Sequence, residues 1–486
     1  MYNFVGCRDN TATYIKNHKT MRRIILGLLV AAATIVATAE IRVVTLDKDS
    51  NLKEILGTDT MTLDSMKING YLSHENLYTV AWMTFRKLAY IDMGDCDLEN
   101  DEIPEEGLNP YPFLIDTDNI DYYTKLSSVI FPKKLKRIGD YALATSLVEN
   151  IELPDELESI GVSAFDSCKR LKGKVTIPEG INTLAASCFY YCARIDTLSL
   201  PSTLKNIEEN ALSGLISMRS INLPNSIQSI GNGACSYWFG YLNDLALPES
   251  LETLGRRAFR QSHIQKLFFN EQCKLASISQ YAFEDCRLTE VSFSPSIIVI
   301  EEGAFRNNFI EELYLPASIR SIDILAFQNC KYLKKVVIPA TIREILGDAF
   351  NSCNSLTDIY IMAMNPPTIV ASSFEYPERM TLYVPEGAKA AYEAANHWKD
   401  FGVIVEVTEF PSAGHEAVIA DGAGSGRAFG AAGEAVVEGD DVPYAIFSTD
   451  GTEAASGVAK GRTTIPLPAG IYVARIGGTS RRIAVR

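Results

Sequence analysis

The chain has 486 residues, of which 47% are hydrophobic and 22% are charged, and its formal net charge is -15. This composition is typical of a folded protein with a large core and excludes an intrinsically disordered chain. The length favours two or three domains or one elongated repeat array. An acidic surface repels phosphate backbones, which argues against a nucleic-acid partner.

The N-terminal residues have the features of an export signal. A Met-Arg-Arg start at 21–23 precedes an apolar run over 24–36, and Ala-Thr-Ala at 37–39 forms a cleavage site. The run is shorter than the roughly 20 apolar residues that span a membrane, so we expect a signal peptide rather than an anchor. We therefore expect translation to start at Met21 and residues 1–39 to be removed. The alternative is an uncleaved anchor; no other stretch is apolar enough to span a bilayer.

An internal repeat dominates the middle of the chain. Residues 151–168 (IELPDELESIGVSAFDSC) and 313–330 (LYLPASIRSIDILAFQNC) share an apolar-x-apolar triplet followed by Pro, a later Ile and an Ala-Phe pair. The position of this Phe, here called the Phe column, recurs every 22 to 24 residues through eleven copies. Its members are Leu143, Phe165, Phe189, Leu212, Cys235, Phe259, Phe283, Phe305, Phe327, Phe350 and Phe374. This period lies within the range of about 20–29 residues found in leucine-rich repeats.

Each repeat predicts one coil of a solenoid. The apolar-x-apolar triplet alternates as a short β-strand does, and the following Pro ends the strand because it has no N–H to donate. Parallel strands of successive coils then stack about 4.8 Å apart, and the remaining apolar positions fill the interior. A second column follows the Phe column by three residues and holds Cys168, Cys192, Cys286, Cys330 and Cys353, with Leu215 and Trp238 in the same slot. A slot that accepts Cys, Leu or Trp indicates buried free thiols rather than disulfides or metal ligands.

The repeat frame resembles the BspA-like leucine-rich repeats of bacterial surface proteins over residues 126–407. The resemblance includes the ending, in which Asn-Pro-Pro at 365–367 and LYVPEG at 382–387 precede four apolar anchors: Tyr392, Trp398, Phe401 and Ile404. From the residues alone, this ending is a last strand followed by an amphipathic helix that caps the array. We expect an α/β repeat solenoid, a right-handed leucine-rich-repeat array of about eleven 22–24-residue coils with a parallel β-sheet.

The flanking segments predict two smaller parts. Residues 40–125 are expected to form an N-terminal α/β cap, with a helix over 74–88 between strands at 66–70 and 88–93. Residues 408–440 are rich in Gly and Ala and indicate a linker, and residues 441–486 indicate a small C-terminal β domain. The succession IPLPAGIYVARIGGTSRRIAVR resembles the C-terminal sorting domains of the type IX secretion system. The alternative is a small β module without a sorting role.

The sequence contains no pattern that indicates catalysis. Serine-hydrolase, Walker A, zinc-protease and Cys-x-x-Cys motifs are absent, and His74, His263, His397 and His415 are dispersed. Carboxylates such as Glu208 and Glu301 fall at variable turn positions, as expected of a solvated rim. We therefore expect no enzyme, no catalytic residue, no metal site and no cofactor.

The residue type at the outward position of the strand triplet changes along the array, and this change indicates a candidate binding surface. In the first half of the array this outward column is mostly small or polar, whereas the second half carries Phe268, Tyr314, Val337, Tyr360 and Tyr383. Strand-face residues of solenoids line extended surfaces, and exposed aromatic side chains are common binding anchors. These five residues are the candidate binding site. The alternatives are that strands favour Tyr in any case, or that the closing helix covers part of the column.

The resemblance implies an exported, secreted or cell-surface adhesion protein, with a periplasmic location as the alternative. We expect a protein or glycan ligand, no nucleic-acid partner, no membrane span after signal removal, and a monomer. A structural envelope scaffold without a discrete ligand is a second possibility, and an enzyme with its site on a flanking domain is a third.

Overall fold

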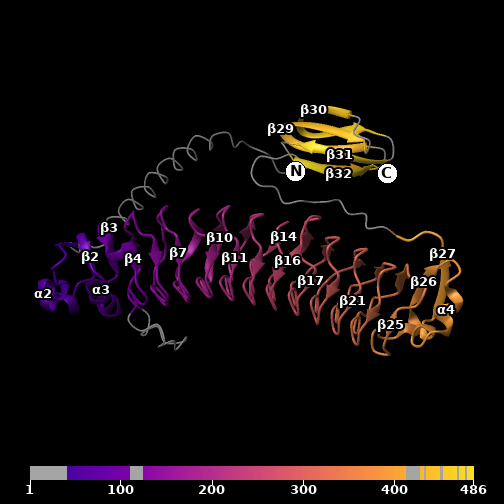
Figure 1. Ribbon diagram of the computed structural model, residues 1–486, viewed down its shortest axis with the longest axis horizontal. Coiled ribbons are helices and arrows are strands. Elements are labelled where there is room, and N and C mark those ends of the chain that lie inside the picture. Colours follow the sequence, from indigo (N-terminus) through magenta and orange to yellow (C-terminus); the bar gives the residue numbers. More distant parts are fainter. Residues whose placement is uncertain are drawn as a thin grey trace, which may run out of the picture.

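The computed structural model describes residues 41–109 and 124–411 and the strands of a C-terminal sheet between residues 427 and 485. The expected signal peptide and its cleavage site lie outside the described residues. No helix in the described ranges has the length and apolar character needed to cross a bilayer. Figure 1 shows the coils of the middle region side by side in one elongated array, from the indigo N-terminal cap to the orange C-terminal end.

The N-terminal cap combines a parallel sheet with short helices. Strands β1 (Arg42–Leu46), β2 (Ser65–Leu72) and β3 (Tyr90–Leu98) pair in order and continue into β5 (Ser128–Ile130) of the solenoid. Helix α3 (His74–Arg86) begins where the Ser73 hydroxyl accepts a hydrogen bond from the Asn76 N–H, and it ends two residues before the predicted Leu88. Its buried face includes Leu77 and Ala81. The remaining short elements are α2 (Leu52–Leu56), η1 (Gly57–Met61) and η2 (Glu99–Asp101).

The solenoid has two strand rows. The first row is the predicted one, formed by the strand triplets. After β5 it consists of β8 (Lys172–Thr176), β10 (Arg194–Ser199), β12 (Ser220–Ile221), β14 (Leu242–Leu247), β16 (Ile264–Phe269), β18 (Glu290–Ser292), β20 (Glu312–Tyr314), β22 (Lys335–Ile338), β24 (Asp358–Ile361), β26 (Thr381–Pro385) and β27 (Val403–Val407). Parallel pairing joins each of these strands to an equivalent strand of a neighbouring coil, for example Leu313 to Val336 and Val336 to Ile359. Residues 151–153, the equivalent triplet of their coil, belong to no strand.

The second row was not predicted. Each coil adds a two-residue strand at its Ser-Ile position, where Ile points inward and the residue before it outward. These strands are β4 (Glu102–Ile103), β6 (Arg137–Ile138), β7 (Ser159–Ile160), β9 (Thr183–Leu184), β11 (Asn206–Ile207), β13 (Ser229–Ile230), β15 (Thr253–Leu254), β17 (Ser277–Ile278), β19 (Val299–Ile300), β21 (Ser321–Ile322), β23 (Glu344–Ile345) and β25 (Thr368–Ile369). Between the rows, the Pro carbonyl accepts a hydrogen bond from the N–H three residues later, as Pro316 does from Ile319 over 3.0 Å. This Pro therefore opens a turn as well as ending a strand.

The Phe column forms a continuous ladder inside the array. The rings of Phe259, Phe283, Phe305, Phe327, Phe350 and Phe374 stack with centroids 5.2 to 5.5 Å apart and planes within 10° of parallel. All but Phe374, which is 3% exposed, are fully buried. Stacked rings in register explain why the period varies so little, since each coil must deliver its ring at the same place.

The Cys column is buried and free, which confirms the prediction, and it has a second role. The Cys286 thiol donates a hydrogen bond to the carbonyl of Phe259, and the Cys353 thiol donates to that of Phe327. In three coils without Cys, the same slot supplies another donor: Trp238 Nε1 to Leu212, Ser262 Oγ to Cys235 and Asn308 Nδ2 to Phe283, whereas Leu215 in this slot has no donor group. The slot therefore satisfies a buried carbonyl of the preceding coil, a role that the sequence pattern did not reveal.

We expect the cysteines of this column to react slowly with a thiol reagent in the folded protein and completely after denaturation. Burial raises the pKa of the Cys192 and Cys286 thiols well above the ordinary value, so little thiolate exists at neutral pH. The measurement is a time course of thiol release with and without denaturant. Incomplete reaction in denaturant that a reductant restores would mean that the cysteines are bridged.

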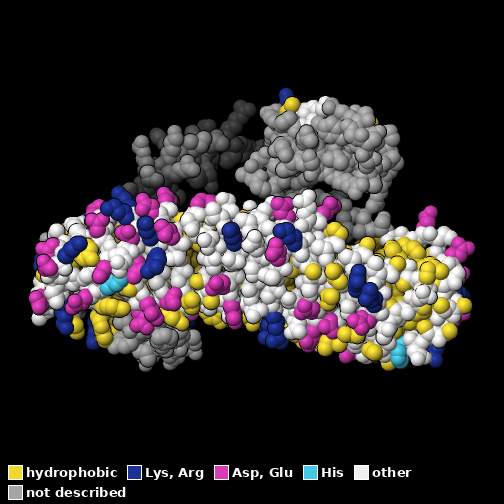
Figure 2. Space-filling view, in the orientation of Figure 1, with side chains coloured by type: hydrophobic (Ala, Val, Ile, Leu, Met, Phe, Trp, Pro, Cys, Tyr) yellow, Lys and Arg dark blue, Asp and Glu magenta, His cyan; other side chains and the backbone are white. Residues whose placement is uncertain are grey.

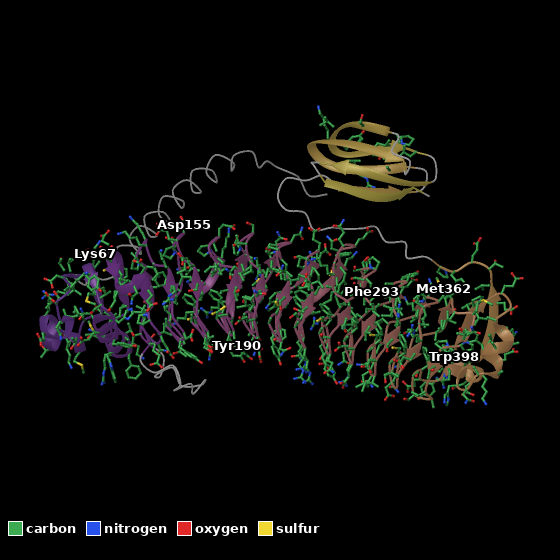
Figure 3. All side chains as sticks on the ribbon, viewed as in Figure 1. Lys67, Asp155, Tyr190, Phe293, Met362 and Trp398 are labelled. Atoms are coloured by element: carbon green, nitrogen blue, oxygen red, sulfur yellow. The ribbon has the colours of Figure 1, made fainter. Side chains whose placement is uncertain are left out.

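The C-terminal end of the array is closed by aromatic side chains. A 3-10 turn η4 (Pro377–Arg379) precedes helix α4 (Lys389–Ala394), and η5 (Trp398–Asp400) leads into β27. The structure adds this strand after the helix, whereas the sequence predicted that the helix would end the array. Tyr392 and Trp398 are buried, and Figure 3 shows Trp398 at this end of the solenoid.

The C-terminal part is an antiparallel sheet in the order β28-β29-β31-β32, with β30 paired to β29. Its strands are β28 (Arg427–Ala431), β29 (Glu434–Ser448), β30 (Glu453–Pro466), β31 (Gly470–Ile476) and β32 (Thr479–Val485). The small β domain is therefore larger than predicted, since β28 and the first half of β29 fall in the expected linker. Ala428, Gly430 and Ala431 of the expected linker are strand residues of β28. Residues 412–426 of that linker lie outside the described residues.

Candidate functional site

The outward column of the first strand row is aligned as predicted over the C-terminal coils. Tyr314 pairs with Val337, Val337 with Tyr360 and Tyr360 with Tyr383. The column ends at Val405 of β27, a residue that the sequence analysis did not include. On the face shown in Figure 2, hydrophobic side chains are more frequent over the C-terminal coils than over the middle of the array.

The three tyrosines of this column are half-buried and held in place. The rings of Tyr360 and Tyr383 stack with centroids 4.1 Å apart and planes 5° from parallel. The Tyr314 hydroxyl donates a hydrogen bond to Glu312 Oε2 over 2.7 Å, and Lys335 Nζ lies 6.0 Å from its ring centroid. Burial, together with hydrogen bonding to the Asp358 carboxylate, raises the pKa of Tyr383 to about 12, so its hydroxyl stays protonated. The column therefore offers fixed aromatic surface and neutral hydroxyls.

Two of the five predicted site residues are not available for contact. Val337 is 4% exposed and Phe268 is 7% exposed, so the expectation that both side chains are exposed for binding is wrong. Val337 is a short side chain between the larger rings of Tyr314 and Tyr360, which accounts for its burial. Phe268 is aligned with Ala246 and Ser292, and these small neighbours do not explain why it is covered. The candidate site on this face is thus reduced to Tyr314, Tyr360 and Tyr383.

A second cluster, which the sequence analysis missed, lies along the turns that follow the Phe column. We call it the turn groove; its volume is about 580 Å³. Figure 3 labels Tyr190, which occupies the equivalent turn of an earlier coil, at the lower edge of the solenoid. One column, two residues after the Phe column, supplies Gln261, Asp285, Asn307 and Asn329. A second column, four residues after it, supplies Phe239, His263, Arg287, Phe309 and Lys331, with Tyr332 beside the last.

Aromatic rings form both ends of the turn groove. Towards the N-terminus, the His263 ring lies 5.3 Å from that of Phe239 and 5.5 Å from that of Tyr241, and His263 Nδ1 lies 3.1 Å from the Phe239 carbonyl oxygen. Towards the C-terminus, Phe309 and Tyr332 meet edge to face at 5.6 Å. Burial and then the nearby Arg287 lower the pKa of His263, which favours its neutral form at pH 7. Phe239, Tyr241, Phe309 and Tyr332 are 41%, 70%, 42% and 55% exposed.

The backbone explains the polar side of the turn groove. Gln261, Asp285, Asn307 and Asn329 have φ angles of 56°, 59°, 60° and 62°, a left-handed conformation that Asn and Asp adopt more readily than most residues. From Gln261 to Asn329 this column therefore presents one polar side chain on each of four successive coils. The signal that could have found this surface is the column four residues after the Phe column, which changes from Lys169 and Ala193 to the aromatic and basic residues of the groove.

The structure also has a shallow hollow of about 410 Å³ over β11, β13 and β15. Glycine, serine, threonine and asparagine line much of it, together with Glu208 and Glu209. Within the described ranges, no group of three or more His, Cys, Asp or Glu side chains is placed to hold a metal ion. Neither observation indicates a catalytic centre.

Asp166 is a carboxyl with a raised pKa, and we expect it to make stability depend on pH. Burial raises its pKa from 3.8 to about 6, although Ser167 Oγ donates a hydrogen bond to it over 2.8 Å. The unfolded chain therefore loses this proton at lower pH than the folded chain, so the free energy of unfolding falls as pH rises from about 4 to about 6. Asp166→Asn should raise the free energy of unfolding at pH 7 by about 1–3 kcal/mol and flatten this dependence.

The check is urea unfolding of the wild type and the variant at pH 4 and pH 7. Asp155→Asn is the control because Asp155 is exposed. If the wild type and Asp166→Asn lose the same stability between the two pH values, burial of the Asp166 carboxyl is not the cause of the loss.

The repeats match a known family of leucine-rich repeats. The model of the BspA type leucine-rich repeat region matches residues 115–238 and 264–381 in six copies. No curated protein matches the chain. A solved leucine-rich repeat protein from Bacteroides ovatus ATCC 8483 is 20% identical, with a TM-score of 0.46 over 67% of this chain and 88% of that chain.

Two further solved structures are similar to this chain. The pneumococcal vaccine antigen PcpA is 21% identical, with a TM-score of 0.39 over 66% of this chain and 80% of that chain. A leucine-rich cell surface protein from Faecalibacterium prausnitzii A2-165 is also 21% identical, with a TM-score of 0.33 over 54% of this chain and 82% of that chain. The stacked parallel strands, the repeat frame and the match to six repeat copies together show that this chain belongs to the BspA-type leucine-rich-repeat family.

Proposed function

We propose that this chain is an exported, non-enzymatic binding protein that holds a protein or glycan ligand on its solenoid, either secreted or at the cell surface. The observation that carries the proposal is the row of Tyr314, Tyr360 and Tyr383 along one strand face. The export signal expected over residues 21–39 supports a location outside the membrane, and the family supports a role in adhesion. Residues 427–485 would then serve in sorting or attachment, as their resemblance to type IX sorting domains suggests.

The physical basis of the proposal is the rigidity of the row. Each tyrosine stands on a strand that pairs with its neighbours, and ring stacking or a hydrogen bond restricts its side chain further. A ligand that contacts such rings loses little additional conformational entropy from the protein. Tyrosine also offers an apolar ring and a polar hydroxyl in one side chain, which suits either a protein surface or a sugar ring.

Replacing Tyr314, Tyr360 and Tyr383 together by Ser tests this function. We expect a loss of at least about 2 kcal/mol of binding free energy, roughly thirtyfold in Kd, for a ligand found by screening extracellular-matrix proteins and glycans. The measurement is titration calorimetry or surface plasmon resonance on the folded variant. Tyr78→Ser is the matched control, since Tyr78 is 45% exposed but lies on helix α3 of the cap.

Two outcomes would contradict the proposal. Unchanged affinity in the folded triple variant would show that the ligand does not contact the tyrosine row. Absence of any ligand from the screen would favour the alternative of a structural envelope scaffold without a discrete ligand.

A further inference from the structure

The turn groove combines apolar platforms with unused hydrogen-bonding groups. Asn329 Nδ2 donates to Asn307 Oδ1 over 2.6 Å, which leaves Asn307 Nδ2 as a donor and Asn329 Oδ1 as an acceptor. Gln261 carries a third amide in the same column. The exposed rings of Phe309 and Tyr332 lie next to this row, so a ligand can meet an apolar face and an amide at the same place.

The turn groove is net positive, whereas the chain as a whole is acidic. Cations of the neighbouring coils are neutralised: Arg260 and Arg306 pair with Glu284 at 2.6 and 3.4 Å, and Lys334 pairs with Glu311 at 2.8 Å. Arg287 and Lys331, which line the groove, form no ion pair with any described residue. Asp285 is the carboxylate among the lining residues, so with His263 neutral the groove carries a net positive charge on a chain whose total is -15.

Tyr241 fixes the orientation of the Arg287 side chain. Its Nη1 donates a hydrogen bond to the Tyr241 hydroxyl over 3.1 Å, and its guanidinium carbon lies 5.9 Å from the Tyr241 ring centroid. The side chain is thereby oriented, while most of its donors stay available. A guanidinium in this position can take a carboxylate through two parallel hydrogen bonds.

The backbone of the groove argues against a peptide as its ligand. Peptides usually add a strand to a free sheet edge or insert side chains into a deep apolar groove. Here the backbone groups bond from coil to coil, as in Gln261 N–H to Glu284 carbonyl at 2.8 Å and Asn307 N–H to Gln328 carbonyl at 2.9 Å. The groove is open, and its rings alternate with amides and charges. Pyranose rings match this pattern, because their C–H faces are apolar and their rims carry hydroxyls.

We propose that the turn groove is a binding site for an acidic oligosaccharide, with sugar rings on Phe309 and Tyr332 and a sugar carboxylate on Arg287 and Lys331. The site lies on other residues than the tyrosine row, so it does not depend on the function proposed for that row. Uronic acids and sialic acids both present a carboxylate to the two cations, and the test below distinguishes these two sources.

The test is binding of the full chain to immobilised oligosaccharides of three kinds: uronic-acid chains, sialic-acid chains and uncharged chains of equal length. We expect retention of at least one acidic kind, and the arm that is retained identifies the source of the carboxylate. Converting that carboxylate to its methyl ester should weaken binding at least tenfold, because the ring remains and only the charge is lost. Arg287→Gln with Lys331→Gln should do the same, and Phe309→Ala with Tyr332→Ala should weaken binding at least fivefold.

The matched control is Arg379→Gln. Arg379 lies over the exposed ring of Tyr376 at 4.6 Å, an arginine on a tyrosine as in the groove but outside it, so this variant should bind normally. All substituted side chains are exposed, so circular dichroism and the unfolding midpoint should stay the same. Retention of no acidic chain, equal binding of ester and acid, or equal binding of a polyglutamate peptide would overturn the proposal. A loss in Arg379→Gln as large as that in the groove variants would also overturn it.

Discussion

Replacing Phe305 by Ala should lower the free energy of unfolding of the solenoid by about 4 kcal/mol, within the range of about 3–5 kcal/mol found for buried Phe. Phe305 is fully buried, and its ring stacks on Phe283 at 5.5 Å and on Phe327 at 5.4 Å. It also meets Phe293 edge to face at 5.6 Å. The substitution removes one ring from the middle of the ladder, so it weakens both interfaces that a single coil makes with its neighbours.

The measurement is urea unfolding followed by circular dichroism, with Phe309→Ala as the control. Phe309 is the same residue type four positions later in the same coil, but it is 42% exposed. We expect its substitution to cost less than about 1 kcal/mol. Equal destabilisation by the two variants would show that the ladder is not the main source of cohesion between coils.

The fold was predictable because the ring ladder requires an aromatic or apolar residue at a nearly constant spacing in the sequence. Each coil must place one ring, one Pro and one inward Ile at fixed points, so the period and the strand register follow from the Phe column. The alignment of Tyr314 with Tyr360 and Tyr383 was correct for the same reason. The exposure of Val337 was not predictable, because the register fixes which way a side chain points and larger neighbours decide how much of it water reaches.

The turn groove was not predictable, because its residues look unrelated along the chain. His263 follows Phe239 by 24 residues and Tyr241 by 22, and each alone resembles a solvated turn residue. Only the stacking of coils brings their rings within 5.5 Å. The donor role of the Cys column was hidden in a similar way, since Cys, Trp, Ser and Asn share no pattern except their ability to reach the carbonyl of the preceding coil.

The end of the array depends on aromatic packing that the ladder alone does not provide. Beyond Phe374 no further Phe of the column continues the stack. Trp398 and Phe401 cover its last ring instead, with centroids 6.0 and 5.4 Å from that of Phe374. Trp398 Nε1 also donates a hydrogen bond to the Pro367 carbonyl over 2.8 Å, and Tyr392 meets the indole edge to face at 5.3 Å. The indole therefore holds the closing helix and β27 against the last coil.

Trp398→Ala should lower the free energy of unfolding of the C-terminal coils by about 3–5 kcal/mol, because it opens a cavity and leaves the Pro367 carbonyl without its donor. Repeat arrays lose structure from an unprotected end, so the amides of β24, β26 and β27 should exchange with solvent faster while those of β8 and β10 stay protected. Hydrogen exchange with peptide-level mass spectrometry measures both regions in one experiment.

Trp398→Phe, which keeps a ring but not the N–H, should lower the free energy of unfolding by about 1–2 kcal/mol. Trp82→Ala is the control for the residue type, since Trp82 is 45% exposed on the cap helix, and its effect should be smaller and absent from β26. Uniform loss of protection along the whole solenoid in Trp398→Ala would show instead that the array unfolds as one unit and that the closing element has no local role.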